Sequence, residues 1–178
     1  MPPKEGFDFL HNISPGKHYY QFYKNPDDFF QVMIPFFQAG LDRGDACLWL
    51  VSEAIGLQRT FQTARMQIRG FKDAISSGQL EILSGERWYL NNGIFDESQA
   101  ILNAQTYLEK IKKAGFECLR GAGDAACIPR PEWGKVDLYE RKMDGWIKSQ
   151  PIIGLCAYPL CNVPPARQKT YSNPTKMC

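Results

Sequence analysis

Apolar and polar residues follow one another along the chain in blocks that predict β-strands and α-helices in turn. Residues 46–51 are apolar throughout, which is typical of a strand covered on both faces of a parallel sheet. Between such runs, apolar residues recur every three or four positions, as in helices with one buried face. The pattern predicts five strands, at residues 18–23, 46–51, 80–83, 116–120 and 152–158.

The predicted helices have recognisable ends. Asn25 and Pro26 form an N-cap and a first-turn proline for a helix that Gly44 should end, although Pro35 inside it should kink it or remove a hydrogen bond. A further helix over residues 97–114 should end at Gly115. Helical spacing marks two others, through Leu57, Phe61, Ala64 and Ile68, and through Val136, Tyr139, Met143 and Trp146.

Strands that alternate with helices indicate the α/β class. We expect a three-layer sandwich with a mostly parallel central sheet and helices on both faces, connected by right-handed crossovers. Residues 1–161 should form a single domain, and residues 162–178, which contain three prolines and little apolar content, a C-terminal tail.

Composition and charge narrow the choice of partners and compartment. The net charge of +2 and the scattered basic residues predict no direct binding to nucleic acid or to membranes. No segment approaches the ~20 apolar residues of a membrane helix, and the N-terminus lacks a secretory signal, so we expect a cytoplasmic protein. Cys47, Cys118 and Cys156 lie in apolar runs, which favours buried free thiols over disulfides.

A ligand site is expected at the carboxyl ends of the strands, where open parallel sheets bind their ligands. The residues predicted to line it are Tyr23, Glu53, Trp88, Tyr89, Arg120 and Tyr158. Two long segments, residues 86–95 and 122–134, are rich in aromatic residues and either form a lid over an apolar pocket or complete the core. The run Gly121-Ala122-Gly123-Asp124 is interpreted as a flexible turn.

The motifs of familiar catalytic and cofactor sites are incomplete. The Gly16-Lys17 pair lacks the first glycine of a P-loop, whose position is occupied by His11, and it precedes the first strand instead of following it. No G-x-S-x-G elbow occurs, and His11, His18 and the cysteines lack the spacing of metal ligands. We therefore expect no catalytic residues, no metal site and no cofactor.

Arg120 allows two interpretations. An arginine at the tip of an apolar strand can bind a carboxylate or phosphate of a ligand. It can equally form a structural ion pair with Asp124, Glu53 or Glu140.

Several blocks together resemble the MEDS sensory-domain family over roughly residues 10–160. They are HYYQFY at 18–23, FFQAGL at 36–41, ACLWLVSE at 46–53, WYL at 88–90, GIFD at 93–96, LRG at 119–121, LYE at 138–140 and LCAY at 155–158. The resemblance implies a RecA-like or KaiC-like core that has lost its P-loop. It also implies a role in prokaryotic signal transduction and transcription regulation, through sensing of simple hydrocarbon derivatives.

The chain departs from the family pattern in two respects. Family members usually continue into another helix after the last strand, and they are usually joined to a DNA-binding or histidine-kinase module, neither of which the sequence shows. The signal from ligand binding is then expected to pass to a downstream signalling protein or through a homodimer.

Three hypotheses follow for the function. The first is a sensing domain that binds a small organic ligand at the strand ends without turnover. The second is a nucleotide-dependent hydrolase or transferase on the same core, with Glu53 or Asp124 as its base. The third is a redox-sensitive interaction module, for which rapid labelling of Cys127 or Cys161 would be evidence.

Overall fold

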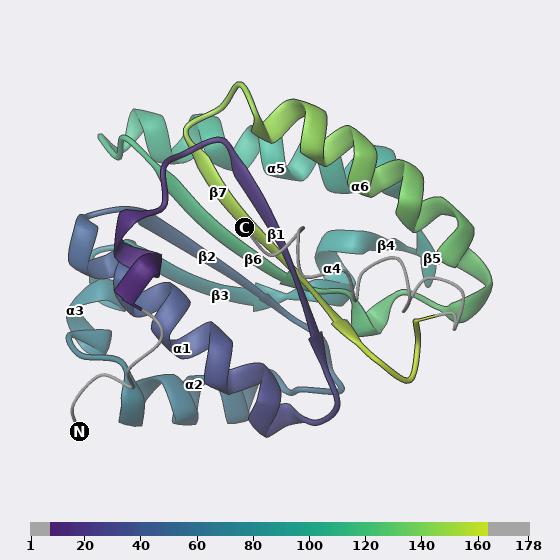
Figure 1. Cartoon of the computed structure of the whole chain (residues 1–178), viewed down its shortest axis with the longest axis horizontal. Coiled ribbons are helices and arrows are strands. Elements are labelled where there is room, and N and C mark those ends of the chain that lie inside the picture. Colours follow the sequence, from purple (N-terminus) through teal and green to yellow (C-terminus); the bar gives the residue numbers. More distant parts are fainter. Residues whose placement is uncertain (1–7, 164–178) are drawn as a thin grey trace.

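A computed structural model describes residues 8–163 and shows a sheet between two layers of helices (Figure 1). The strands of this sheet are β1 (Lys17–Tyr23), β2 (Ala46–Val51), β3 (Leu80–Ser84), β6 (Leu119–Asp124) and β7 (Ile152–Pro159). The helices are α1 (Pro26–Arg43), α2 (Leu57–Gln67), α3 (Phe71–Ser76), α4 (Gly85–Tyr89), α5 (Glu97–Lys113) and α6 (Trp133–Ile147). A hairpin of β4 (Leu90–Asn91) and β5 (Ile94–Phe95) and the short 3₁₀ turns Asp8–Asn12, Ala125–Cys127 and Arg130–Glu132 complete the described part.

The central sheet is parallel throughout, with the strand order β1-β7-β6-β2-β3. Helices α1, α2 and α3 lie on one side of it and α5 and α6 on the other (Figure 1). The predicted three-layer α/β class is therefore confirmed. The predicted tail begins at residue 162, and all of it beyond residue 163 lies outside the described residues.

The fourth predicted strand needs a correction. We expected a strand at residues 116–120 and a flexible turn at 121–124, whereas β6 runs from Leu119 to Asp124 in the middle of the sheet. Glycine usually weakens a strand, which explains the wrong prediction. Gly123 is needed here because a Cβ atom at this position would overlap the hydroxyl group of Tyr89.

Helix α1 confirms the predicted end signals. The Asn25 side chain accepts hydrogen bonds from the backbone N–H groups of Asp27 and Asp28, at 2.9 and 3.0 Å. Gly44 ends the helix in the left-handed region, with φ of 82°. Pro35 lies inside the helix without ending it.

Each face of the sheet has its own apolar core. Trp49 is fully buried in the core under α1, where its ring stacks on Phe37 with centroids 4.7 Å apart. The core under α5 and α6 includes Tyr89, Phe95 and Trp133. Tyr89, Phe95 and Trp133 therefore complete this core, which is the second of the two alternatives that we considered, whereas Trp88 packs against the core but stays partly exposed.

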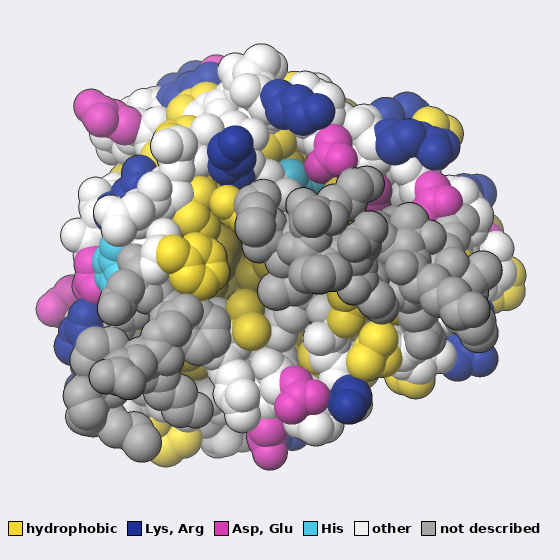
Figure 2. Space-filling view, in the orientation of Figure 1, with side chains coloured by type: hydrophobic (Ala, Val, Ile, Leu, Met, Phe, Trp, Pro, Cys, Tyr) yellow, Lys and Arg dark blue, Asp and Glu magenta, His cyan; other side chains and the backbone are white. Residues whose placement is uncertain are grey.

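The surface carries charges of both signs. In Figure 2, hydrophobic side chains gather near the middle of the face where β1 lies in front, and Lys, Arg, Asp and Glu side chains are intermixed around its rim. Within residues 8–163, no helix combines the length and apolar character that crossing a membrane requires. Cys47, Cys118 and Cys156 are buried free thiols, as predicted, whereas Cys127 is partly buried and Cys161 exposed.

Candidate functional site

The carboxyl ends of three strands are joined by a buried carboxylate. Asp124, at the end of β6, is fully buried and accepts a hydrogen bond from the Tyr23 hydroxyl at 2.7 Å. It also accepts hydrogen bonds from the Ser52 hydroxyl and, at 3.1 Å, from the backbone N–H of Ala126. Burial raises the pKa of Asp124, although these hydrogen bonds lower it in part. This network holds the ends of β1, β2 and β6 together and leaves Asp124 enclosed.

A cavity lies next to this network, beyond the carboxyl ends of β2 and β3. Its volume is about 640 Å³, within the usual range for small-molecule sites. We call it the β2–β3 cavity. Its lining comes from the ends of the two strands, the start of α2 and helix α4, and consists of Val51, Glu53, Gly56, Leu57, Gln58, Ile82, Leu83, Ser84, Glu86, Arg87 and Trp88.

The acidic rim of the β2–β3 cavity is held in place by hydrogen bonds. Glu86 accepts one at 2.7 Å from the backbone N–H of Glu53 and one at 3.1 Å from the Ser84 hydroxyl. Ser84 in turn caps α4 by accepting a hydrogen bond from the N–H of Arg87. The lining thus carries two carboxylates and one guanidinium, which together favour neutral or cationic ligands over anions.

The structure separates the six residues that we predicted for the ligand site. Glu53 and Trp88 line the β2–β3 cavity. Tyr23 lies in the Asp124 network, and Tyr89 is buried in the core under α5 and α6. Tyr158 lies on β7, where its hydroxyl group donates a hydrogen bond to Glu140.

Arg120, the sixth of these residues, was placed wrongly at a strand tip. Since β6 begins at Leu119, Arg120 lies at the opposite end of the strand and is fully buried. Its guanidinium forms an ion pair with Asp45 at 3.1 Å and donates hydrogen bonds to the carbonyl oxygens of Leu10 and Phe36. Arg120 therefore has a structural role, with Asp45 as a partner that we did not predict.

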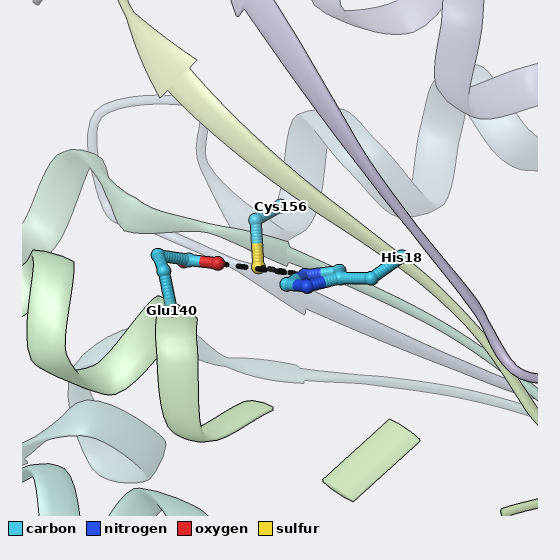
Figure 3. A group of neighbouring side chains, drawn as sticks. All are labelled: His18, Glu140 and Cys156. Carbon is cyan, nitrogen blue, oxygen red and sulfur yellow. Dashed lines mark hydrogen bonds and ion pairs between the residues drawn. The ribbon is translucent and has the colours of Figure 1, made fainter. Parts of the chain in front are cut away.

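A second polar cluster lies between the sheet and α6, where His18, Glu140 and Cys156 point toward one another (Figure 3). His18 Nε2 lies 3.2 Å from Cys156 Sγ and 3.5 Å from Glu140 Oε2. His18 Nδ1 lies 2.7 Å from Asp144 Oδ1, and this contact lowers the pKa of Asp144. The sequence offered no metal-ligand spacing for these residues, because only the fold brings them together.

His18 lies between Cys156 and Asp144, which is the arrangement of a nucleophile, a base and an acid that orients the base. However, burial raises the pKa of the Cys156 thiol well above its usual range, and the neighbouring Glu140 carboxylate raises it further. Burial raises the pKa of Glu140 as well. The environment thus favours the protonated thiol and not the reactive thiolate.

The fold and the cavity together define a three-layer α/β domain with a small-molecule-sized cavity at the carboxyl edge of its sheet. The chain matches the family model MEDS, the methanogen/methylotroph, DcmR sensory domain, over residues 17–172. This match covers most of the chain, so the chain belongs to the MEDS family of sensory domains. No curated protein sequence matches the chain significantly.

Proposed function

We propose that this domain senses a small organic molecule, a simple hydrocarbon derivative, that binds in the β2–β3 cavity. The observation that carries the proposal is the position of the cavity, at the strand ends where parallel sheets bind ligands, in a chain of a sensory family. Leu57, Ile82 and Leu83 give the cavity apolar walls, and Trp88 adds an aromatic surface.

The charges of the lining narrow the class of ligand. Glu53 and Glu86 outnumber Arg87, and Glu86 is already fixed by its two hydrogen bonds. Alcohols, halides, thiols and especially amines should therefore bind better than carboxylic acids of the same size. Binding would shift the domain toward its ligand-bound conformation, and the signal would pass to a partner protein or a second copy of the chain.

A thermal-shift panel on the purified protein tests the proposal. The compounds are one-to-three-carbon alcohols, amines, thiols, halides and acids, with magnesium-ATP as the alternative ligand. A compound that binds the native state raises the unfolding midpoint, by about 2.7 kcal/mol of stability at a hundredfold excess over its Kd. A rise with magnesium-ATP alone would contradict the proposal.

Two tryptophan variants then locate the binding site. Trp88→Ala removes the aromatic wall of the cavity and should abolish the response to the compound. Trp146→Ala is the matched control, because Trp146 packs against the core beneath α6 and does not line the cavity. Equal responses of the two variants would place the ligand elsewhere.

A further inference from the structure

His18, Glu140 and Cys156 present the donor atoms of a metal site at the edge of the sheet farthest from the β2–β3 cavity. His18 comes from β1, Cys156 from β7 and Glu140 from α6. Strands β1 and β3 are the two opposite edges of the sheet, so this cluster is separate from the cavity. The three side chains are almost completely enclosed: Cys156 and Glu140 are 8% and 5% exposed, and the His18 side chain is 3% exposed.

The donor atoms are already spaced as metal ligands are. Tetrahedral zinc, with bonds of about 2.3 Å to sulfur and about 2.0–2.1 Å to nitrogen or oxygen, separates its ligand atoms by about 3.3–3.6 Å. The distances from His18 Nε2 are 3.2 Å to Cys156 Sγ and 3.5 Å to Glu140 Oε2. All three donor atoms lie within 4.8 Å of one another, so side-chain shifts alone would place an ion between them.

One oxygen of Glu140 points to a missing ligand. Its Oε1 accepts a hydrogen bond from the Tyr158 hydroxyl, whereas Oε2 is buried and, within residues 8–163, has no hydrogen bond of good geometry. Its polar neighbours are the His18 ring, with Nε2 at 3.5 Å, and the Cys156 thiol. A buried carboxylate oxygen that has lost its hydration and has only such weak partners is costly. A cation between Oε2, Sγ and Nε2 would compensate for this loss.

The surroundings hold the His18 ring in the orientation that a metal requires. Asp144 accepts the hydrogen bond from Nδ1–H, which leaves the lone pair of Nε2 directed at Cys156 and Glu140. On the other side, Gly154 makes room for the ring, because a Cβ atom there would lie 3.1 Å from His18 Cδ2 and 2.9 Å from Ile147 Cδ1. A carboxylate behind a histidine ligand is the usual outer-shell partner in zinc sites.

We propose that His18 Nε2, Cys156 Sγ and Glu140 Oε2 bind a divalent transition-metal ion of the zinc class. Thiolate, carboxylate and neutral imidazole together carry two negative charges, which balance the ion, and the protons of any protonated thiol or carboxyl group pass to solvent on binding. A nitrogen, sulfur and oxygen donor set selects zinc or cobalt over magnesium and calcium. Three protein ligands leave a fourth position for water or a small ligand.

The test is a cobalt(II) titration of the full chain after treatment with a chelator. Cobalt replaces zinc and reports its ligands, with a near-ultraviolet charge-transfer band for a thiolate and intense visible bands for tetrahedral geometry. We expect both bands to saturate at a single equivalent of cobalt and to disappear when zinc, but not magnesium, is added. A wild-type chain that shows no thiolate band overturns the proposal, whatever the variants do.

Variants assign the ligands. Cys156→Ser should abolish the thiolate band, whereas Cys127→Ser, which changes a cysteine outside the cluster, should keep it. Glu140→Gln should weaken cobalt binding at least tenfold while the thiolate band persists at saturation. A band that survives unchanged in Cys156→Ser would show that another cysteine binds the metal, and would overturn the proposal.

Asp144 is a positioning residue in this site. Because its side chain is partly exposed, replacing it should perturb the fold little. Its side chain is 42% exposed, so Asp144→Asn should fold normally. Loss of an outer-shell carboxylate should weaken metal binding about 10- to 100-fold and leave the cobalt bands in place at saturation. Asp73→Asn, at an exposed position on α3, is the control and should bind with unchanged affinity. Equal affinities of the two variants would contradict the role of Asp144.

Discussion

Arg120 and Asp45 form a buried ion pair, with 3.1 Å between Arg120 Nε and Asp45 Oδ2. The Arg120 side chain is completely enclosed and that of Asp45 is 5% exposed. The Nη1 group of Arg120 donates hydrogen bonds to the carbonyl oxygens of Leu10 and Phe36, each at 3.2 Å. One arginine thus connects β6 to the N-terminal 3₁₀ turn and to α1.

Replacement of Arg120 should destabilise the fold strongly. Arg120→Met leaves the buried Asp45 carboxylate with only the longer contact to Arg43, at 3.8 Å, and removes the donors of two carbonyl groups. This should lower the free energy of unfolding by about 3–5 kcal/mol. Urea denaturation measures the change. Arg65→Met, at an exposed position on α2, should stay within about 0.5 kcal/mol of the wild type. A loss below about 1 kcal/mol for Arg120→Met would contradict this role.

Gly40 and Gly145 lie inside α1 and α6 and should respond oppositely to alanine. A Cβ atom at Gly40 would lie 2.7 Å from Arg120 Cδ and 2.8 Å from Cys47 Sγ, so Gly40→Ala should cost about 1–3 kcal/mol. Gly145 has no such neighbour within 4 Å, and Gly145→Ala should stabilise the protein by about 0.5–1 kcal/mol. Thermal or urea unfolding of the two variants measures both changes in stability relative to the wild type. The same sign for both variants would disprove the close packing at Gly40.

Asp124 should make the stability depend on pH in a defined direction. Burial raises the pKa of Asp124 in the folded protein, so the native state keeps this proton longer than the unfolded chain does. This contribution to stability is fully present below the unfolded pKa of about 3.9 and is lost as the pH rises through the raised folded value. The difference in unfolding free energy between the wild type and Asp124→Asn should therefore decrease as the pH rises.

Urea denaturation of both proteins across this pH range measures the difference. The comparison cancels the contributions of the other acidic groups, which the two proteins share. A difference that increases with pH would mean that the hydrogen bonds from Tyr23, Ser52 and Ala126 outweigh burial.

Glu53 should contribute to ligand selectivity at the β2–β3 cavity. Its backbone N–H, and not its carboxylate, contacts Glu86, so Glu53→Gln removes one charge and keeps the hydrogen bond. The affinity for amines should fall about two- to fivefold, the equivalent of an exposed ion pair, while that for alcohols stays the same. Glu109→Gln, on the exposed face of α5, is the control. A parallel loss for amines and alcohols would argue against an electrostatic role.

The secondary structure was largely predictable because the signals for it are local. The periodicity of apolar residues identified five strands and the main helices, and Asn25 and Gly44 marked the ends of α1 correctly. The prediction was wrong at residues 121–124, where glycine suggested a turn. Gly123 is instead explained by the approach of Tyr89, a residue 34 positions earlier in the chain, and a close approach of this kind leaves no local signal.

Two of the six residues predicted for the ligand site line the β2–β3 cavity, and the other four do not. Glu53 and Trp88 line the cavity because both follow shortly after a strand, as the pattern indicated: Glu53 lies two residues after the end of β2, and Trp88 four residues after the end of β3. Arg120 was assigned to the wrong end of its strand because the strand boundary was misplaced by a few residues. A shift of this size moves a side chain from one end of a short strand to the other, at about 3.3 Å per residue.

The sequence by itself determined the α/β class, the succession of strands and helices and the membership in the MEDS family, since these depend on patterns along the chain. The tertiary structure decided which strands are neighbours. His18 and Cys156 are 138 positions apart, yet β1 and β7 pair in parallel with His18 opposite Gly154 and Tyr20 opposite Cys156. The two-residue repeat of a strand then turns both side chains toward α6 and Glu140, and no local pattern could have predicted this meeting.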